Sequence, residues 1–597
     1  MQEPTDSLKE YERRLRERTR VLAEHARWEN ALANIRLVVF IAGAVVAWLA
    51  LGSHAIHWAW IAIPVAGFVA LVVVHDRTLR AMRRLKSGVT YYERGIARIE
   101  DRWMGTGWDG ADLVPEDHPY AGDLDMFGPS SLFQLLCTAQ TRAGGKTLAD
   151  WLCAPAPIDE IRARQAAVEE LRPRIDLREE LSFHSRTLET SVLPKTIAAW
   201  AEAPPLFRSR ALAVVAYGAS ALAILAGIAC YNGAPASVLA IPSIALIVLH
   251  LITRRRVHAV TAAAYEPAWE LDVVGRVLAR LEQEPFESSY LRAVQDGFKD
   301  GVQWASAAIA RLGQLRRLQE ASGNLLFGPF AFVLMWDYHF ARAADAWRVR
   351  NRATIARWLE GVGRLEAACA LASYAYEHPR DPFPAVDADG PVFDGHGLGH
   401  PLVAADRCVR NDVKLDTQLK LLIVSGSNMS GKSFMLRTVG INAVLACAGA
   451  PVRARELHIS PLMVGATLNV HDSIQAGVSR FYAEIKRIRA LVEITKGPTP
   501  LLFLLDEIMH GTNSQDRRIG ARAIVHSLLK AGAIGIVTTH DLALTGLVDD
   551  FGGHAVNAHF EDHLQDGQLV FDYRLYPGVV TRSNALDLMR AIGLDVD

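Results

Sequence analysis

Residues 420–433 read KLLIVSGSNMSGKS, and the sixteen residues that follow read FMLRTVGINAVLACAG. The first six residues predict a buried strand, and the sixteen predict a helix. The glycine-rich segment between them matches the pattern G-x-x-x-x-G-K-S, which in this context is typical of a phosphate-binding loop, or P-loop. After residue 399, short β-rich runs alternate with helical patterns, so the C-terminal region predicts an α/β domain with a parallel sheet.

The loop residues each have an expected role in binding ATP with Mg²⁺. Backbone N–H groups of the loop are expected to surround phosphate oxygens. The Lys432 ammonium should reach the β- and γ-phosphates, and the Ser433 hydroxyl should ligate Mg²⁺. The predicted ATP-binding residues are Gly426, Ser427, Asn428, Met429, Ser430, Gly431, Lys432 and Ser433.

Two further apolar runs end in residues suited to the same chemistry. Residues 501–505 (LLFLL) lead into Asp506 and Glu507, and residues 533–538 lead into Thr539 and His540. Asp506 is expected to hold Mg²⁺ through water, and Glu507 to polarise the attacking water as general base. A histidine at a strand end can sense the γ-phosphate by a hydrogen bond. The predicted catalytic residues are Glu507, Lys432 and His540, and the predicted metal ligands are Ser433 and Asp506.

These segments resemble the MutS family, the ATPases of DNA mismatch repair and related processes. Residues 426–433 are similar to the family's GPNMGGKS, and residues 506–514 are similar to its DEIGRGTS segment. Residues 478–484 (VSRFYAE) resemble its serine-bearing signature. That resemblance implies that Ser479 acts in trans on the nucleotide of a partner, and therefore a homodimer. Residues 131–171 resemble the start of the family's core and lever domain.

The chain also departs from the family pattern. No Phe-x-Glu, the element with which mismatch-binding members read a mispair, occurs in it. Cys408 or Val409 stands where the family often places an aromatic residue against adenine. An apolar hairpin occupies the N-terminal region. The resemblance therefore implies a membrane-anchored member that lacks the mismatch-recognition domain.

Apolar segments explain a mean hydropathy of +0.12 in a chain of 597 residues. They form two pairs with short connections and contain no Asp, Glu, Lys or Arg: residues 37–52 and 58–74, then 211–231 and 236–252. Each approaches or meets the length needed to cross a bilayer, although buried core helices are the alternative. Arginines flank both pairs and are absent from the connections, which predicts a multi-pass inner or plasma membrane protein with both termini and the ATPase domain cytoplasmic.

Charge and cysteine content limit the classes of partner. The net charge of −1 argues against a broadly basic nucleic-acid coat, so DNA binding would need a local basic surface. The basic residues of the lever region suggest one, or are solvated helix faces: Arg316, Arg317, Arg348, Arg350, Arg352 and Arg357. Six scattered cysteines without a CxxC pair make a zinc site or a disulfide framework unexpected.

The predicted architecture is a C-terminal P-loop NTPase domain of ABC/MutS type, preceded by an all-α core and lever region with two transmembrane hairpins. Residues 1–34 alternate in charge and are expected to form a solvated cytoplasmic helix with ion pairs within it. The segments expected after it are a first hairpin (35–77), a basic helix and linker (78–122), a first core segment (123–209), a second hairpin (210–256), the lever with a second core segment (257–377), a linker (378–398) and the ATPase domain (399–597).

Two classes of function follow. The first is a membrane-anchored ATPase that dimerises through its nucleotide domains and couples ATP state to DNA binding, without mismatch recognition. The second is an ABC-type membrane ATPase, or an ATP-driven scaffold that acts on a protein partner. No LSGGQ-like segment occurs, and the apolar segments carry no internal charge, so no small-molecule transport substrate is expected.

Overall fold

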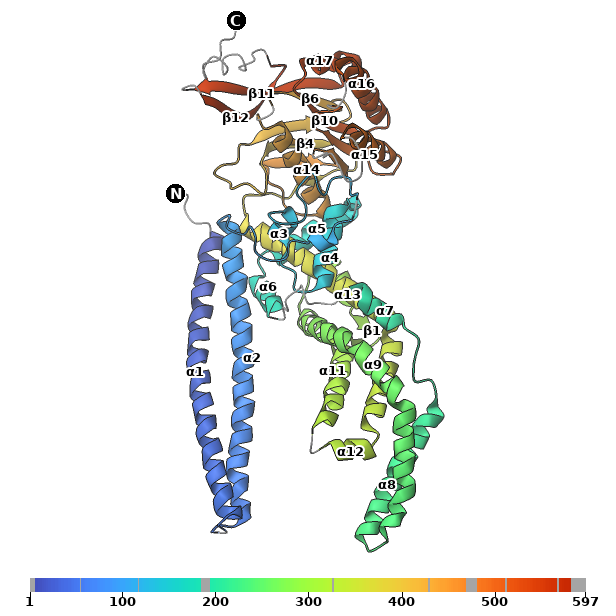
Figure 1. Cartoon of the computed structure of the whole chain (residues 1–597). Coiled ribbons are helices and arrows are strands. Elements are labelled where there is room, and N and C mark those ends of the chain that lie inside the picture. Colours follow the sequence, from blue (N-terminus) through green and yellow to red (C-terminus); the bar gives the residue numbers. More distant parts are fainter. Residues whose placement is uncertain are drawn as a thin grey trace. The chain divides into compact units, whose positions relative to one another are not determined.

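The computed structural model forms two compact units, and Figure 1 shows their elements. Unit 1 comprises Met1–Thr138, Leu148–Phe183 and Ala368–Asp597, and unit 2 comprises Ala139–Thr147 and His184–Ala367. The structure describes residues 6–53, 55–115, 117–183, 194–324, 327–427, 430–468, 480–509, 513–565 and 568–580. The N-terminal region is helical and the C-terminal region is mixed α/β, as the sequence predicts.

A six-stranded sheet forms the centre of the C-terminal region, in the order β12-β11-β6-β10-β9-β8. All neighbours are parallel except the antiparallel pair β11 and β12. The strands are β6 (Leu421–Ser425), β8 (Met463–Thr467), β9 (Leu501–Leu505), β10 (Ile534–Thr539), β11 (Ala555–Gln565) and β12 (Gln568–Pro577). Strands β6, β9 and β10 are buried along their whole length, which explains why they read as unbroken apolar runs.

Helices follow the parallel strands and place the strand ends at one edge. They are α14 (Lys432–Ala448), α15 (Arg480–Ile494), α16 (Ser514–Lys530), α17 (Leu542–Thr545) and the 3₁₀ turn η6 (Gly546–Phe551). Strand β6 is flanked by β10 on one side and β11 on the other, so the strand order reverses at β6. In such sheets ligands bind outside the carboxyl ends of the strands at this point. The fold therefore directs attention to the residues just after β6, β9 and β10.

The segment 378–398, expected to be a linker, differs from that expectation. It contains two strands of a second sheet, ordered β3-β7-β4-β5. The strands are β3 (Ala385–Val386), β4 (Phe393–Leu398), β5 (Asn411–Leu415) and β7 (Glu456–Ile459). The Pro, Asp and Gly residues of this segment favour turns, but pairing of β4 with both β5 and β7 overrides that preference.

Two long helices of unit 1 lie side by side over most of their length (Figure 1). Helix α1 runs over Asp6–Leu51 and helix α2 over Ala62–Ile99, with a 3₁₀ turn η1 at Trp58–Ile61. Neither helix breaks at the expected boundaries near residues 34 and 77. Smaller elements of the unit are η2 (Ala111–Leu113), α3 (Leu132–Leu136), α5 (Ile158–Leu171) and α6 (Ile175–Ser182).

Among its described residues, unit 2 is helical, as predicted for residues 257–377, apart from one short hairpin of two-residue strands. Its principal helices are α7 (Pro194–Glu202), α8 (Arg210–Tyr231), α9 (Ala240–Leu281), α10 (Ser289–Asp296), α11 (Ala305–Glu320) and α12 (Gly328–Val333), with η4 (Ala236–Leu239) and η5 (Ala321–Gly323). Strands β1 (Lys299–Asp300) and β2 (Gln303–Trp304) form the hairpin. Helices α4 (Arg142–Cys153) and α13 (Trp336–Glu377) each begin in unit 2 and end in unit 1.

Among the described residues, four helical segments are long and apolar enough to cross a membrane by length and composition. They are Asp6–Leu51, Trp58–Ile99, Arg210–Tyr231 and Ala236–Leu281. Their most apolar windows are 0% buried in the first pair and 22% buried in the second. Such contiguous exposed apolar surface is unusual for a protein surrounded by water.

The charged start of α1 is not a purely solvated helix, which corrects that interpretation. Within the helix, Arg14 pairs with Glu10 at 2.6 Å, as the charge alternation predicts. The other face packs against α2 and α6, however. Tyr11 is fully buried in a cluster with Tyr91, Tyr92 and Ile175, and Arg18 donates two hydrogen bonds, of 2.6 and 2.9 Å, to the Glu179 carboxylate.

A buried ion pair joins the end of α2 to the end of α13. The Arg98 guanidinium donates to both carboxylate oxygens of Glu377, at 2.6 and 2.5 Å. The side chains are 9% and 0% exposed, and the Tyr11 hydroxyl donates to the same carboxylate at 3.4 Å. Removing one member of such a pair leaves a buried charge without compensation.

We expect Arg98→Met to lower the stability of the full chain by about 3–5 kcal/mol, because Glu377 would stay buried and unpaired. Thermal unfolding of the detergent-solubilised protein measures the effect. Arg102→Met is the control, since that side chain is 66% exposed and pairs with the nearby Glu100. Equal unfolding midpoints for the two variants would contradict a structural role for the pair.

Candidate nucleotide-binding site

The loop between β6 and α14 has the backbone that a phosphate-binding loop requires. Gly426 has φ +151° and Gly431 has φ +103°, a conformation that side chains rarely adopt. A Cβ atom at Gly431 would lie 2.9 Å from Cδ1 of Tyr573, and one at Gly426 would lie 2.7 Å from Oγ of Ser430. Glycine at both positions therefore avoids these close contacts and the strain of a positive φ.

Lys432 lies in the first turn of α14 with its ammonium folded back over the loop. Its Nζ donates to the carbonyl oxygens of Gly426 at 2.7 Å and Ser427 at 2.8 Å. Burial lowers the pKa of Lys432, and the negative charges of Glu507 and Asp506 oppose that shift. The ammonium is therefore held at the loop by two of its carbonyl oxygens.

Ser433 and Asp506 come together although 73 residues separate them. The Ser433 hydroxyl donates to Oδ2 of Asp506 at 2.5 Å. The other carboxylate oxygen, Oδ1, accepts a short hydrogen bond from the Thr538 hydroxyl. Thr538 thus orients Asp506 from β10, a role that the sequence patterns did not predict. The sequence feature that could have indicated this role is the position of Thr538 near the end of a buried strand, two residues before His540.

Glu507 lies between two cationic or ionisable groups. Its Oε1 is 3.9 Å from Nζ of Lys432 and 3.3 Å from Nδ1 of His540. Glu507 has φ +50°, an uncommon conformation for a residue with a side chain. Its backbone N–H donates to the carbonyl and the hydroxyl of Thr538, both at 3.2 Å, which holds the peptide in this strained position. The structure therefore brings together Lys432, Ser433, Asp506, Glu507 and His540.

A small apolar cavity of about 20 Å³ adjoins the loop at Gly431. Val409, Phe434, Phe560 and Tyr573 are among the residues that line it. Tyr573 comes from β12 and is fixed through Asn411, which donates from Nδ2 to the Tyr573 carbonyl at 3.0 Å and accepts at Oδ1 from the Leu575 N–H at 2.8 Å. No sequence pattern indicated Tyr573, because only the pairing of β12 with β11 places this late residue beside the loop.

A second aromatic contact lies next to this cavity. The His400 ring stacks on Phe434 with centroids 4.8 Å apart. Burial lowers the pKa of His400 to about 4, with smaller contributions from Arg437 and Arg453. His400 is therefore neutral at physiological pH and acts as a flat packing surface.

Some predicted residues lie outside the part of the chain that the structure describes. They are Asn428, Met429 and the signature residue Ser479. Helix α15 begins directly after Ser479, and its buried Glu484 accepts from the Met509 N–H at 2.6 Å.

Two of the basic residues suggested as a DNA-binding surface make contacts within the protein instead. Arg348 is buried and pairs with Asp345 at 2.7 Å, and its Nη1 donates to the Trp200 carbonyl at 2.9 Å. Arg316 lies over the Trp269 ring at 4.4 Å. These two arginines are structural, whereas Arg350 and Arg352 are exposed.

Comparison with known proteins agrees with this geometry. Residues 422–596 match the family model described as MutS domain V. Endonuclease MutS2 of Thermomicrobium roseum is 32% identical over 258 residues, which cover 40% of this chain and 31% of that relative. Endonuclease MutS2 of Thermus thermophilus is 30% identical, with the same coverage of both chains. DNA mismatch repair protein MutS 2 of Halobacterium salinarum is 31% identical, covering 41% of this chain and 29% of that relative.

The chain spans about a third of the length of the curated relatives it matches, so the similarity covers one region of each protein. Within that region lie the loop after β6 and the polar residues that follow β9 and β10. The relatives and the family model agree on the same assignment. The C-terminal region of this chain therefore matches MutS domain V and is similar to the corresponding region of these MutS relatives.

Proposed function

We propose that this protein is a membrane-anchored MutS-like ATPase that dimerises through its nucleotide domains and couples its ATP state to DNA binding. One observation carries the ATPase assignment. The ends of three parallel strands bring together an ammonium, a hydroxyl–carboxylate pair and a carboxylate–imidazole pair. This combination suits phosphate binding and activation of a water molecule.

The hydroxyl–carboxylate pair suits a magnesium ion. Ser433 Oγ and the Asp506 carboxylate offer hard oxygen donors 2.5 Å apart, and Thr538 holds the carboxylate in place. A bound Mg²⁺ would neutralise charge on the β- and γ-phosphates. Ser433 would bind it directly, and Asp506 would hold it through water.

The remaining residues act on the phosphate chain and the water. Lys432 would exchange its two carbonyl acceptors for oxygens of the β- and γ-phosphates, which stabilise a charged ammonium better. Glu507 would accept the proton of the attacking water. His540, 3.3 Å from Glu507, would orient that carboxylate and respond to the γ-phosphate. Tyr573 would stack on the adenine ring, with Val409 and Phe434 on the same side of the loop.

The relatives and one exposed surface support the partner assignments. Relatives named endonuclease or DNA mismatch repair protein share this domain, which favours DNA as the target of the ATP cycle. Tyr482 is 63% exposed in the first turn of α15 and comes three residues after Ser479 in the sequence. An exposed aromatic side chain in the first turn of α15 favours a dimer interface at this end of the helix, because aromatic residues are enriched at such interfaces.

Four exposed apolar helical segments support anchoring in a bilayer. Their flanking arginines favour an inner or plasma membrane location with both termini and the nucleotide domain in the cytoplasm. The same segments favour the alternative, an ABC-type membrane ATPase or an ATP-driven scaffold for a protein partner. The internal contacts of Arg316 and Arg348 also favour a partner other than DNA. A salt-dependence experiment separates the two.

We expect Glu507→Gln to retain ATP binding and to lower turnover at least about 100-fold, because the base is lost while the phosphate contacts stay. Nucleotide binding by filter retention and phosphate release measure the two properties. Glu493→Gln is the matched control, since that carboxylate is exposed on α15 and pairs with Lys496 at 2.5 Å. Unchanged hydrolysis by Glu507→Gln would refute the general-base assignment.

We expect Tyr573→Ala to weaken ATP binding by about 1–3 kcal/mol, the usual contribution of aromatic stacking on a base. Competition by tripolyphosphate provides the contrast, because that ligand has no base and should bind both proteins equally. Tyr573→Phe should bind ATP as the wild type does. An equal loss for ATP and tripolyphosphate would show that Tyr573 supports the loop and not the base.

We expect the detergent-solubilised full chain to shift a DNA duplex in a gel at low salt, with affinity that falls as salt rises. Arg352→Gln should reduce the slope of log K against log salt by about one, because one phosphate contact is lost. Arg102→Gln, an exposed arginine of the other unit, should leave the slope unchanged. Absence of any shift at low salt would favour the scaffold or the ABC-type alternative.

A further inference from the structure

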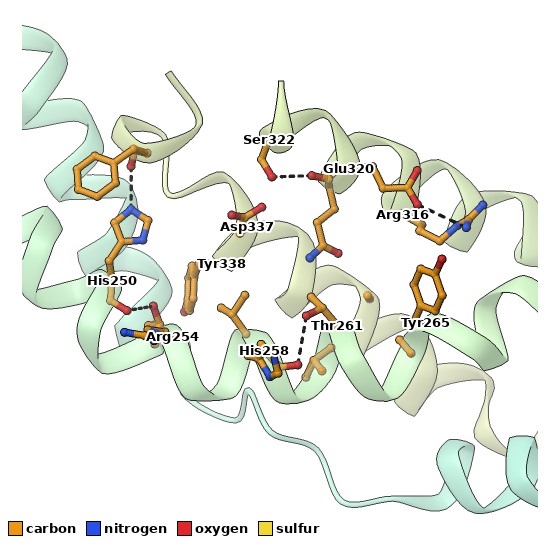
Figure 2. A pocket seen from close by; sticks show the side chains of 18 of the residues that line it. His250, Arg254, His258, Thr261, Tyr265, Arg316, Glu320, Ser322, Asp337 and Tyr338 are labelled. Atoms are coloured by element: carbon orange, nitrogen blue, oxygen red, sulfur yellow. Dashed lines mark hydrogen bonds and ion pairs between the residues drawn. The ribbon is translucent and has the colours of Figure 1, made fainter. Parts of the chain in front are cut away.

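Unit 2 contains a cavity of about 720 Å³. All of the residues that line it come before the proposed nucleotide site in the sequence. It lies between α9, α11, the turn after α11, α12 and the start of α13, and Figure 2 shows its lining. This volume is within the range typical of small-molecule sites. Most of the lining surface is apolar, and polar side chains from α9, α11 and α13 also face the cavity, so an amphiphilic ligand fits its chemistry.

The cavity extends along α9 across the point where the apolar segment ends and charged residues begin. Its lining begins at Ile247 and His250, within the apolar segment, and continues past Arg254 to Ala268. The triplet Arg254, Arg255 and Arg256 follows the apolar segment directly. Under the proposed membrane anchoring, on which this inference rests, the cavity lies at the cytoplasmic boundary of the bilayer.

Helix α12 adds an apolar surface at the same place. Residues 324–336 (NLLFGPFAFVLMW) contain no charged side chain but are too short to span a bilayer, a length typical of interfacial segments. Phe330 is 64% exposed and Phe332 is 42% exposed. The Phe332 carbonyl lies 3.0 Å from His250 Nε2, and the two rings stack at 4.3 Å, so α12 contacts α9 beside the cavity.

One polar side chain of the lining carries an unsatisfied buried donor. The Tyr338 side chain is 1% exposed, and its hydroxyl has no hydrogen-bond partner among the described residues. Figure 2 shows this hydroxyl directed at the turn of α9 that carries Arg254. Burial raises the pKa of Tyr338, and the positive charges of Arg342 and Arg256 oppose that rise. A buried donor in a positive field favours an anionic acceptor.

We infer that this cavity binds an acidic glycerophospholipid from the cytoplasmic leaflet. The phosphate accepts from the Tyr338 hydroxyl and faces Arg254, and the acyl chains lie along Leu251, Val257 and Phe332 towards the bilayer. Asp337, also in the lining, accepts hydrogen bonds from headgroup hydroxyls such as those of glycerol. Glu320 does not oppose the phosphate strongly, because Arg316 lies 3.5 Å from its carboxylate.

Native mass spectrometry of the detergent-purified full chain tests this inference with phosphatidylglycerol and phosphatidylcholine as probes. We expect one phosphatidylglycerol to be retained in preference to phosphatidylcholine. Tyr338→Phe and Arg254→Gln should each weaken retention roughly tenfold, because each removes one hydrogen bond or charge to the phosphate. Ala264→Phe should abolish retention by filling the cavity, which Ala264 lines.

Matched controls separate this site from general lipid attraction. Arg255→Gln removes an adjacent arginine, and Ala262→Phe adds a ring on α9, both at exposed positions outside the lining. Both controls should retain phosphatidylglycerol as the wild type does. Equal retention by all variants, or equal competition by soluble glycerol phosphate, would overturn the inference. Alkaline extraction of membranes tests the anchoring separately, and release of the wild-type protein would overturn the anchoring. Lipid retention by the protein in detergent micelles tests the cavity itself.

Discussion

The parallel pairing of β10 between β6 and β9 is the constraint on which the proposed nucleotide site depends. Thr539 pairs with Ser425 and Val537 pairs with Leu505, so the three strands end at the same edge of the sheet. This register brings Asp506 and Thr538 within hydrogen-bonding distance, and the loop from β6 to α14 adds Ser433. A shift of one residue would turn every side chain of β10 to the opposite face and separate Thr538 from Asp506.

Sequence patterns predicted those elements of the site that are encoded locally. Unbroken apolar runs located β6, β9 and β10, and the polar residues after each run identified Lys432, Ser433, Asp506, Glu507 and His540. Thr538 and Tyr573 escaped prediction because their positions depend on strand pairing across the sheet. The same cause explains the strands found at 378–398. Local composition favours turns there, whereas the partners of β4 lie later in the chain.

Charged residues show a similar division between local and tertiary determinants. The alternation of charge at the start of α1 correctly predicted ion pairs within the helix. It could not reveal that Tyr11, Arg14 and Arg18 face α2 and α6, because no pattern within α1 identifies its neighbours. Arg348 in unit 2 is a second charged residue whose tertiary contacts were not evident from the sequence pattern. Its sequence context suggested a basic surface, whereas its contacts are Asp345 and backbone carbonyls.

The Arg98–Glu377 pair has a mechanical consequence for the helices that it joins. Helix α1 contains 46 residues, so at a rise of about 1.5 Å per residue it is roughly 70 Å long. A rotation of about 5° at its base would move the far end of such a rod by about 6 Å. A bilayer around the hairpin would resist that displacement. Because the Arg98–Glu377 pair ties the end of α2 to the end of α13, a hairpin held still by a bilayer would also hold the last turn of α13 in place. Any movement of the C-terminal sheet would then take place relative to that turn.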